Sequence, residues 1–551
     1  MIRARVKEIV DSCFQEGVNR QYWSDGAAGS YTVEQPKREG QGDLATNLAM
    51  IVAGRDKKNP RAVAAQLVEL LAGSPLFDKV EIAGPGFVNF FIKKEVWQSV
   101  LSEVCRQDQT FGLSQVGAGK KVLVEFVSAN PTGPLSVGHG RQAVLGDAIC
   151  RLLAATGHQV TREYYYNDAG RQMRVLAQSV QARYLELLGE EGQFPEDGYQ
   201  GDYIVDIAKD LQAEHGDTLR GQEDLTPFQL KAEQAIFADI NGTLERLSIH
   251  FDNYYNEHSL YDEGHIDDVV AQLRAKGLVY DQDGAVWFKT SELGLDQDRV
   301  IIKSTGEPTY RLPDIAYHRE KFKRGFDWMV NIFGSDHIAT VPDVMAGIRA
   351  LGYDDSKVTV VLHQFVTLVR DGKQVKMSTR KATFVTVDEL LSEVGQDVVR
   401  FFFLMRKADS QLEFDLGLAT QQSQENPVYY VQYAHARVCS ILRQAEERGL
   451  PLGEIADARL DLLVESEELD LLKEMAAYPE LVQSAAYDLA PHRIIFYLQD
   501  LAGKFHSYYN KHRVISEDQA LTQVRLWLIN GLRMSLRNGL VLIGVKAPET
   551  M

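Results

Sequence analysis

The chain has 551 residues, of which 45% are hydrophobic and 25% are charged, and its formal net charge is −18. This length exceeds what one hydrophobic core usually supports, so we expect three or four domains. The composition is that of a globular protein in water, and no apolar run is long enough for a transmembrane helix. The acidic balance argues against a protein that coats nucleic acid, although an enzyme with local basic patches remains open.

The N-terminus and the cysteines exclude two further classes. Residues 1–14 place their apolar side chains on one face of a charged helix, which differs from the uninterrupted apolar core of a signal peptide. We therefore expect a cytoplasmic protein that neither spans nor binds a membrane. The four cysteines lie far apart and form no CxxC pair, so the sequence predicts neither disulfides nor a zinc site: Cys13, Cys105, Cys150 and Cys439.

Residues 1–115 mix helical and strand patterns, which predicts an α+β domain. Pro60 is suited to the first turn of a helix, and an apolar stripe follows it. The segments 79–82 and 87–92 have strand composition and flank the turn Gly84-Pro85-Gly86. The glycine-rich loop 117–121 marks the predicted boundary to the next domain.

Residues 116–390 alternate strands with helices, which predicts a doubly wound parallel α/β sheet. The expected strands are 122–127, 159–166, 328–333 and 358–369, and an apolar helix face lies within 144–153. Residues 175–300 are too long for a simple crossover connection and look mostly helical. We expect them to form a subdomain inserted in the sheet.

Residues 391–551 show helical periods and no strand pattern, so we expect an all-α bundle there. The clearest helical segments are 430–443, 460–477 and 484–509. The predicted fold class is therefore multidomain α/β, with an α+β N-terminal domain, a Rossmann-like catalytic sheet that carries a helical insertion, and a C-terminal helical bundle.

The segment from Asn130 to Gly140 has the pattern of a phosphate site. A predicted strand ends there, a proline- and glycine-rich loop follows, and Gly138-His139-Gly140 opens a helix. That arrangement directs free main-chain N–H groups and the positive end of the helix toward a ligand above the sheet edge. A second segment, 370–391, contains a turn signal followed by Lys376, Arg380 and Lys381. A basic loop of this kind is suited to closing over ATP phosphates.

These two segments and the order of the domains resemble the arginyl-tRNA synthetases, a family of class I aminoacyl-tRNA synthetases. The first segment is similar to the HIGH signature in the form that the arginyl family carries, with Ser136 at the position of the first histidine. The resemblance implies that His139 and Ser136 are catalytic. It also implies that ATP is bound by the surrounding residues Asn130, Pro131, Thr132, Gly133, Pro134, Leu135, Val137, Gly138 and Gly140.

The second segment is similar to the KMSK loop of the same family. Lys376, Met377 and Ser378 are in place, and Thr379 stands at the position of the final lysine, for which a following basic residue would substitute. The resemblance implies a catalytic role for Lys376 and ATP contacts by Met377 and Ser378. Asp336 and His337, which follow a predicted strand, are implied near the ribose and base. They lack a third ligand at metal-binding spacing, and we expect no bound zinc.

Recognition of arginine requires carboxylates opposite its guanidinium group, because buried charges must be paired. Tyr310 and Asp314 are four residues apart on one predicted helix face, and the resemblance implies that they hold the guanidinium together with Glu257. It assigns the α-amino end to Asn130, helped by Glu125. Leu312-Pro313 departs from the Thr-Arg that the family often has there.

Contacts with tRNA are implied at both ends of the chain. Phe87 and Asn89 resemble the D-loop contact of the N-terminal domain, and residues 426–442 resemble the start of the helical anticodon-binding domain. Tyr430 and Tyr433 are three apart, so their rings share one helix face and are suited either to stacking on bases or to core packing. The final residue, Met551, is implied to lie near the anticodon.

The resemblance implies that L-arginine, ATP with Mg²⁺, and tRNA(Arg) react to give arginyl-tRNA, AMP and pyrophosphate, and that the protein is a monomer. Two alternatives remain open from the sequence. A small-molecule nucleotidyltransferase would share the Gly-His helix start but would not need the C-terminal bundle. A tRNA-binding paralogue without activity would account for Ser136 and Thr379.

Overall fold

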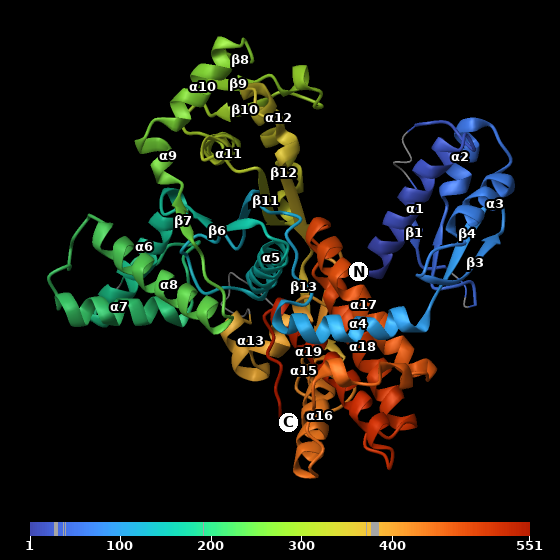
Figure 1. The fold of residues 1–551 in the computed structure, drawn as a ribbon. Coiled ribbons are helices and arrows are strands. Elements are labelled where there is room, and N and C mark those ends of the chain that lie inside the picture. The colour runs from blue at the N-terminus through green and yellow to red at the C-terminus, as the bar shows by residue number, and fades with distance from the viewer. Residues whose placement is uncertain (27–30, 37, 39, 191, 371, 376–384) are drawn as a thin grey trace.

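The structure is a computed structural model, and it describes residues 1–26, 31–36, 38, 40–190, 192–370, 372–375 and 385–551. Figure 1 shows an N-terminal unit set apart from the rest, a central sheet with two lobes attached, and a bundle of long helices at the C-terminus. Among the described residues, no helix is both long enough and apolar enough to cross a membrane.

The N-terminal unit is an antiparallel sheet covered by helices, as the sequence predicts. Its strands lie in the order β1-β2-β4-β3, and β3 and β4 pair around residues 84–86. Asn59 caps the helix that begins at Pro60 by accepting a hydrogen bond from the Arg61 N–H. The elements are α1 Ile2–Asn19, β1 Val33–Glu34, β2 Leu44–Thr46, α2 Leu48–Asp56, α3 Pro60–Leu71, β3 Phe77–Ala83, β4 Phe87–Ile92 and α4 Lys94–Gln107.

The central sheet is parallel and doubly wound, which confirms the predicted fold class. Its order is β12-β11-β5-β6-β7, and every neighbouring pair is parallel. The chain runs outward from β5 and then crosses back to β11, so a crevice for ligands is expected at the carboxyl ends of these two strands. The strands are β5 Lys121–Glu125, β6 Gln159–Tyr166, β7 Asn253–Asn256, β11 Trp328–Gly334 and β12 Val358–His363.

Helices cover both faces of this sheet. Helix α5, Val137–Ala155, packs on an apolar face, where Val124 and Val330 belong to the same buried cluster as Val144 and Leu145. Helix α11, Arg311–Lys323, packs on the other face, where it meets the polar residues Glu125, Glu163 and Asn331. Helix α12, Val341–Leu351, connects β11 to β12.

The segment 175–300, predicted as one insertion, forms two insertions, one before and one after β7. The first, between β6 and β7, is helical as expected and consists of α6 Gly170–Leu187, α7 Asp202–His215 and α8 Thr226–Arg246. The chain then returns to the sheet as β7. A second insertion contains an antiparallel sheet, so the expectation of one helical subdomain is wrong there: α9 His258–Asp262, α10 His265–Ala275, β8 Val279–Gln282, β9 Ala285–Phe288 and β10 Arg299–Ile302.

The expectation of no strand after residue 390 is also wrong. Strand β15, Leu412–Asp415, pairs in parallel with β13, Val366–Arg370, in a small sheet that β14, Lys373–Gln374, completes. The predicted strand 358–369 is therefore divided between two sheets. The helices α14 Gln396–Phe403 and α15 Leu416–Ala419 contact this sheet, and α13 Val387–Val394 packs on α14 and α5.

The C-terminal bundle consists of α16 Pro427–Glu447, α17 Ser466–Tyr487, α18 His492–Lys511 and α19 Gln519–Leu542. The predicted helix 484–509 is two helices, because Leu489 adopts a left-handed conformation and Pro491 follows it. Helix α4 packs on α17 and α19, and both of these also contact α5 (Figure 1). The bundle is thus in direct contact with the helix of the first motif.

Candidate active site

The loop after β5 is held in an uncommon backbone conformation. Val127 and Ser128 have φ values of 67° and 44°, in the left-handed region that β-branched residues rarely adopt. Such strain persists only where the surroundings fix the backbone. Here the Tyr164 hydroxyl donates to the Ala129 main-chain oxygen at 2.8 Å, and the Tyr165 N–H donates to the Ser128 hydroxyl at 3.2 Å. Strand β6 therefore fixes the loop.

The start of α5 fixes the tautomer of His139. Ser136 is the N-cap residue, and its hydroxyl accepts from the His139 main-chain N–H. The Ser136 N–H lies 3.3 Å from His139 Nδ1, which must accept this bond. Burial lowers the pKa of His139, against the opposing effect of the Asp336 carboxylate, so the imidazole is neutral near pH 7. Its proton is then on Nε2, which has no hydrogen-bond partner in the described parts of the chain and can donate to a ligand.

The structure brings the two motifs together at their edges. The Val387 N–H donates to the Leu135 oxygen at 2.9 Å, and Ser136 forms an isolated bridge with Thr386. A Cβ atom at Gly140 would lie 2.7 Å from the Val387 side chain, so this close approach needs a glycine. The predicted ATP-contacting and catalytic residues Lys376, Met377 and Ser378, and also Thr379, Arg380 and Lys381, lie outside the described residues.

The other residues of the first motif line the same loop. Asn130 accepts a bond from the Asn167 N–H at 3.0 Å, and the Thr132 oxygen accepts from the Tyr203 hydroxyl at 2.8 Å. A Cβ at Gly133 would lie 2.9 Å from that hydroxyl, whereas a Cβ at Gly138 would meet only the Ser136 hydroxyl, at 3.7 Å. The remaining members are buried or half-buried: Pro131, Pro134, Leu135 and Val137.

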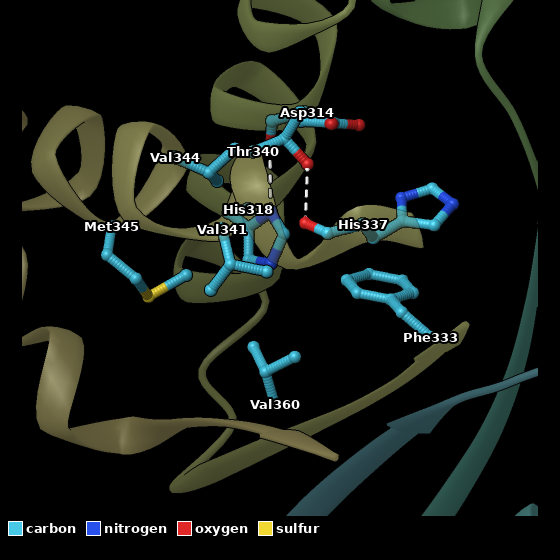
Figure 2. Close-up of a pocket in the computed structure, with 9 residues that line it drawn as sticks. All are labelled: Asp314, His318, Phe333, His337, Thr340, Val341, Val344, Met345 and Val360. Carbon is cyan, nitrogen blue, oxygen red and sulfur yellow. Dashed lines mark hydrogen bonds between the residues drawn. The ribbon is translucent and has the colours of Figure 1, made fainter. Parts of the chain in front are cut away.

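Asp336 and His337 lie at the carboxyl end of β11, as expected, in the 3-10 turn 335–339. Both side chains are exposed, and the His337 ring stacks on Phe333 with centroids 5.2 Å apart. A small cavity of about 20 Å³ is lined by residues that include Asp314, His318 and His337 (Figure 2). Among the described residues, no three His, Cys, Asp or Glu side chains are arranged to hold a metal ion.

Glu257 is a buried acid whose hydrogen-bond partners among the described residues are all neutral. Its carboxylate accepts from the Tyr165 hydroxyl at 2.7 Å and from the Asn167 side-chain amide at 2.7 Å. The Tyr261 hydroxyl lies 3.5 Å away. Burial raises the pKa of Glu257, although these hydrogen bonds oppose the shift. No basic group among the described residues lies within 4.0 Å of it.

Asp314 is the second acid of the same site. Burial, reinforced by the negative charges of Glu125 and Glu257, raises the pKa of Asp314 to about 8, while the Lys321 charge opposes the shift. The described residues include no ion-pair partner for this carboxylate. Tyr165 feels the charges of Glu257, Asp314 and Glu125, so the three acids surround one tyrosine. Within the part of the chain that the structure describes, neither Glu257 nor Asp314 has the cation that a desolvated carboxylate requires.

Two of the predicted arginine contacts differ from expectation. Glu125 is 3% exposed and forms an ion pair with the buried Lys321, so its charge is already neutralised. Tyr310 is 83% exposed at the N-cap position of α11, one turn before Asp314. The tyrosine hydroxyls that reach Glu257 are those of Tyr165 and Tyr261.

Sequence reasoning missed Tyr165. The signal was available, because Glu163, Tyr165 and Asn167 alternate along the end of β6 and share one face. Lys321 and His318 were missed for a different reason. They lie on a helix pattern with a polar stripe, which normally indicates a solvated face.

The predicted tRNA contacts are at the surface with one exception. Phe87 is 40% exposed and Met551 is 55% exposed. Asn89 is only 5% exposed within β4, so the expected surface contact by this side chain is not available in this conformation. Tyr430 and Tyr433 share one face of α16, as predicted, and both pack against His506, at centroid distances of 4.7 and 6.0 Å.

Comparison with known proteins identifies the family. Three family models cover the chain in order: "Arginyl tRNA synthetase N terminal domain" over residues 2–92, "tRNA synthetases class I (R), catalytic domain" over 100–407, and "DALR anticodon binding domain" over 431–551. An arginine–tRNA ligase from Desulfotalea psychrophila is 65% identical over the full length of both chains. The chain belongs to the arginyl-tRNA synthetase family.

Further relatives agree with this membership. An arginine–tRNA ligase from a Geobacter species is 49% identical, covering all of this chain and 99% of its own length. The solved structure of the Thermus thermophilus arginyl-tRNA synthetase is 24% identical and superposes with a TM-score of 0.78 over all of both chains, which shows the shared fold. The alternative of a small-molecule nucleotidyltransferase is thereby excluded.

Proposed function

We propose that the protein activates L-arginine with ATP and Mg²⁺ and transfers the arginyl group to the terminal adenosine of tRNA(Arg). The observation that supports it best is the pair of acids Glu257, which is buried, and Asp314, which is half-buried; neither has a cationic partner within 4.0 Å among the described residues. A guanidinium group offers planar donors in a fork that suits two carboxylates. The pair lies at the carboxyl edge of the doubly wound sheet, near the phosphate-binding loop.

The first step needs positioning more than acid–base chemistry. An oxygen of the arginine carboxylate attacks the α-phosphorus of ATP, and pyrophosphate leaves with the bonding electron pair. His139 Nε2–H donates to a phosphate oxygen, and the N–H groups at the start of α5 face the same charge. Lys376 offsets the charge that develops on the leaving pyrophosphate, and Met377 and Ser378 contact the nucleotide.

The second step transfers the arginyl group. The 2′-hydroxyl of the terminal adenosine attacks the carbonyl carbon of the adenylate, and AMP leaves. Asn130 holds the α-amino end of the substrate throughout. We assign residues 1–115 to contacts with the tRNA D-loop, through Phe87, and residues 391–551 to the anticodon, through Tyr430, Tyr433 and Met551. The exposed ring of Phe87 and the half-buried rings of Tyr430 and Tyr433 are suited to stacking on unpaired bases.

Exchange of radiolabelled pyrophosphate into ATP tests the proposal. The full-length protein is assayed with arginine, with citrulline, with lysine and without amino acid, each with and without tRNA(Arg). We expect exchange with arginine alone among the three amino acids. No exchange with arginine in the presence of tRNA would contradict the proposal and favour a tRNA-binding paralogue without activity.

A further inference from the structure

Helix α11 buries a polar stripe against the central sheet. Asp314, Tyr317, His318 and Lys321 have the i, i+3, i+4, i+7 spacing of one helix face, which is normally apolar in a packed helix. Leu312 and Ile315 take the apolar contacts on the other side. Burial of polar groups is costly unless each finds a partner, so this stripe requires a matching set of polar groups on the sheet.

The sheet supplies that set in a continuous chain of hydrogen bonds. Lys321 Nζ lies 2.5 Å from Glu125 Oε2 and 2.8 Å from Asn331 Oδ1. Asn331 Nδ2 lies 2.7 Å from His318 Nε2, and His318 Nδ1 lies 2.7 Å from the Asp314 main-chain oxygen. Lys321 and Asn331 are fully buried and His318 is 3% exposed.

Only one assignment of protons satisfies this chain. The Lys321 ammonium can only donate, so the Asn331 oxygen faces it and the Asn331 amide nitrogen faces His318. His318 Nε2 must then accept, and Nδ1–H donates to the carbonyl of Asp314. Burial, aided by the Lys321 charge, lowers the pKa of His318 to about 3, which agrees with a neutral ring. The chain therefore has a single arrangement, and no member can rotate without losing a bond.

We propose that His318 and Asn331 are positioning residues that set the length of the amino acid accepted by the site. Their hydrogen bonds connect the turn of α11 that carries Asp314, which faces the guanidinium end of the bound arginine, to the Glu125–Lys321 ion pair. That pair lies beside the loop that holds the α-amino end of the arginine. This inference rests on the proposed function, because it takes Asp314 as a guanidinium contact. His318 also borders the cavity in Figure 2, so shortening its side chain leaves space into which the start of α11 can shift.

The test compares three amino acids: arginine, its homologue with one more methylene, and its homologue with one fewer. One methylene usually changes kcat/KM by about 10–200-fold in a shaped site. A length ratio is the kcat/KM for arginine divided by that for one of the two homologues. We expect His318→Ala to raise the arginine KM and to reduce both length ratios by about tenfold, with the ATP KM unchanged. The readout is pyrophosphate exchange in the presence of tRNA.

Two further variants separate the bonds of the ring. His318→Asn keeps a donor near the Asp314 carbonyl, and His318→Gln keeps an acceptor for Asn331. The length ratios of each variant should therefore lie between those of wild type and those of His318→Ala. Tyr317→Phe is the matched control. It removes a buried 2.6 Å hydrogen bond to Glu163 from the same helix face but leaves the chain intact. We expect it to lower the melting temperature and to keep the length ratios.

Equal losses of kcat/KM for all three amino acids, with a lowered melting temperature, would overturn the proposal, because the chain would then be structural only. If His318→Ala does not fold, the asparagine and glutamine variants carry the same comparison. Failure of the proposed function is distinguished by the wild-type protein, which would then give no exchange with arginine at all.

Discussion

The amino-acid end and the phosphate end of the candidate site consist of different chemical groups. The amino-acid end consists of two carboxylates: Glu257 is buried and accepts from a neutral hydroxyl and a neutral amide, and Asp314 is half-buried beside it. The phosphate end consists of His139, main-chain N–H groups at the start of α5, and the exposed residues Asp336 and His337. Buried charge without a partner is costly, so the first end should decide which amino acid binds. The second end should decide how fast it reacts.

Breaking the amino-acid end should have the largest effect. Citrulline has the shape of arginine without the charge, so it offers Glu257 and Asp314 no cation, and loss of that pairing costs about 3–5 kcal/mol. Asp314→Asn should raise the arginine KM steeply and narrow the preference for arginine over citrulline, while binding of ATP alone stays near normal. Glu257→Gln should act in the same direction. The measurement is pyrophosphate exchange with each amino acid.

If Asp314→Asn and Glu257→Gln both prefer arginine over citrulline as strongly as wild type does, the guanidinium contact lies elsewhere in the chain. Lys376→Ala is the control, because its expected contact is with the leaving group, so it should leave the preference for arginine over citrulline unchanged.

Breaking the phosphate end should lower the rate and spare recognition. Loss of one charge-stabilising contact costs about 2–4 kcal/mol in the transition state, by analogy with deletion of an oxyanion donor. We therefore expect Lys376→Ala to reduce kcat with little change in the arginine KM. Single-turnover formation of the adenylate measures this step directly. An unchanged rate would assign the working cation to Arg380 or Lys381.

The sequence predicted elements that depend on local patterns and missed those that depend on distant partners. Strand 159–166 and the helix start at Pro60 were found from periodicity and backbone chemistry. Strand β15 is four residues long and pairs with β13 about 45 residues earlier, so nothing nearby in the sequence marks it. Helix α11 was placed correctly, but its polar stripe has the pattern of a solvated face and is buried.

The same contrast applies to the site. The motif at Asn130 to Gly140 was recognised because glycine, proline and histidine at a strand–helix junction have a local physical role. That Glu125 is neutralised by Lys321 could not be predicted, because the pairing joins residues 196 positions apart. Tyr310 was expected beside Asp314 from helical spacing, and it does lie one turn before Asp314 with a helical backbone, but its ring is 83% exposed.

The two ends of the site should also differ in how ligand binding depends on pH. With a pKa of about 8, Asp314 holds a proton at pH 7 in the free protein. A bound guanidinium lowers that pKa, so binding releases the proton. The arginine Kd should therefore rise by up to about tenfold for each unit of pH below 8 and stay flat above it. The ATP Kd should not follow this profile.

Calorimetry in buffers of different ionisation enthalpy measures the proton released on arginine binding. We expect a release near pH 7 that disappears in Asp314→Asn. Binding without proton release in the wild-type protein would show that Asp314 is ionised before the substrate arrives. The contribution of Asp314 to the free energy of unfolding changes with pH in the opposite direction to that of an acid in an ion pair. The folded protein binds the proton more tightly than the unfolded chain, so this group favours folding below its unfolded pKa and loses that contribution as pH rises toward 8.

The smallest expected effect concerns Ser136, which takes the position of the first histidine of the signature. Its hydroxyl caps α5 and lies 3.2 Å from His139 Nδ1, so it acts on the imidazole and on the helix end. Ser136→Ala should cost about 1 kcal/mol of stability, as for other N-caps, and should also lower kcat modestly, because the ring loses one of its two Nδ1 neighbours. Asn59→Ala, which removes the cap of α3 far from the site, is the matched control. It should cost similar stability in thermal unfolding without lowering kcat for exchange. If the two variants behave alike, Ser136 only caps the helix; if kcat falls by a hundredfold or more in Ser136→Ala, the hydroxyl contacts the phosphate itself.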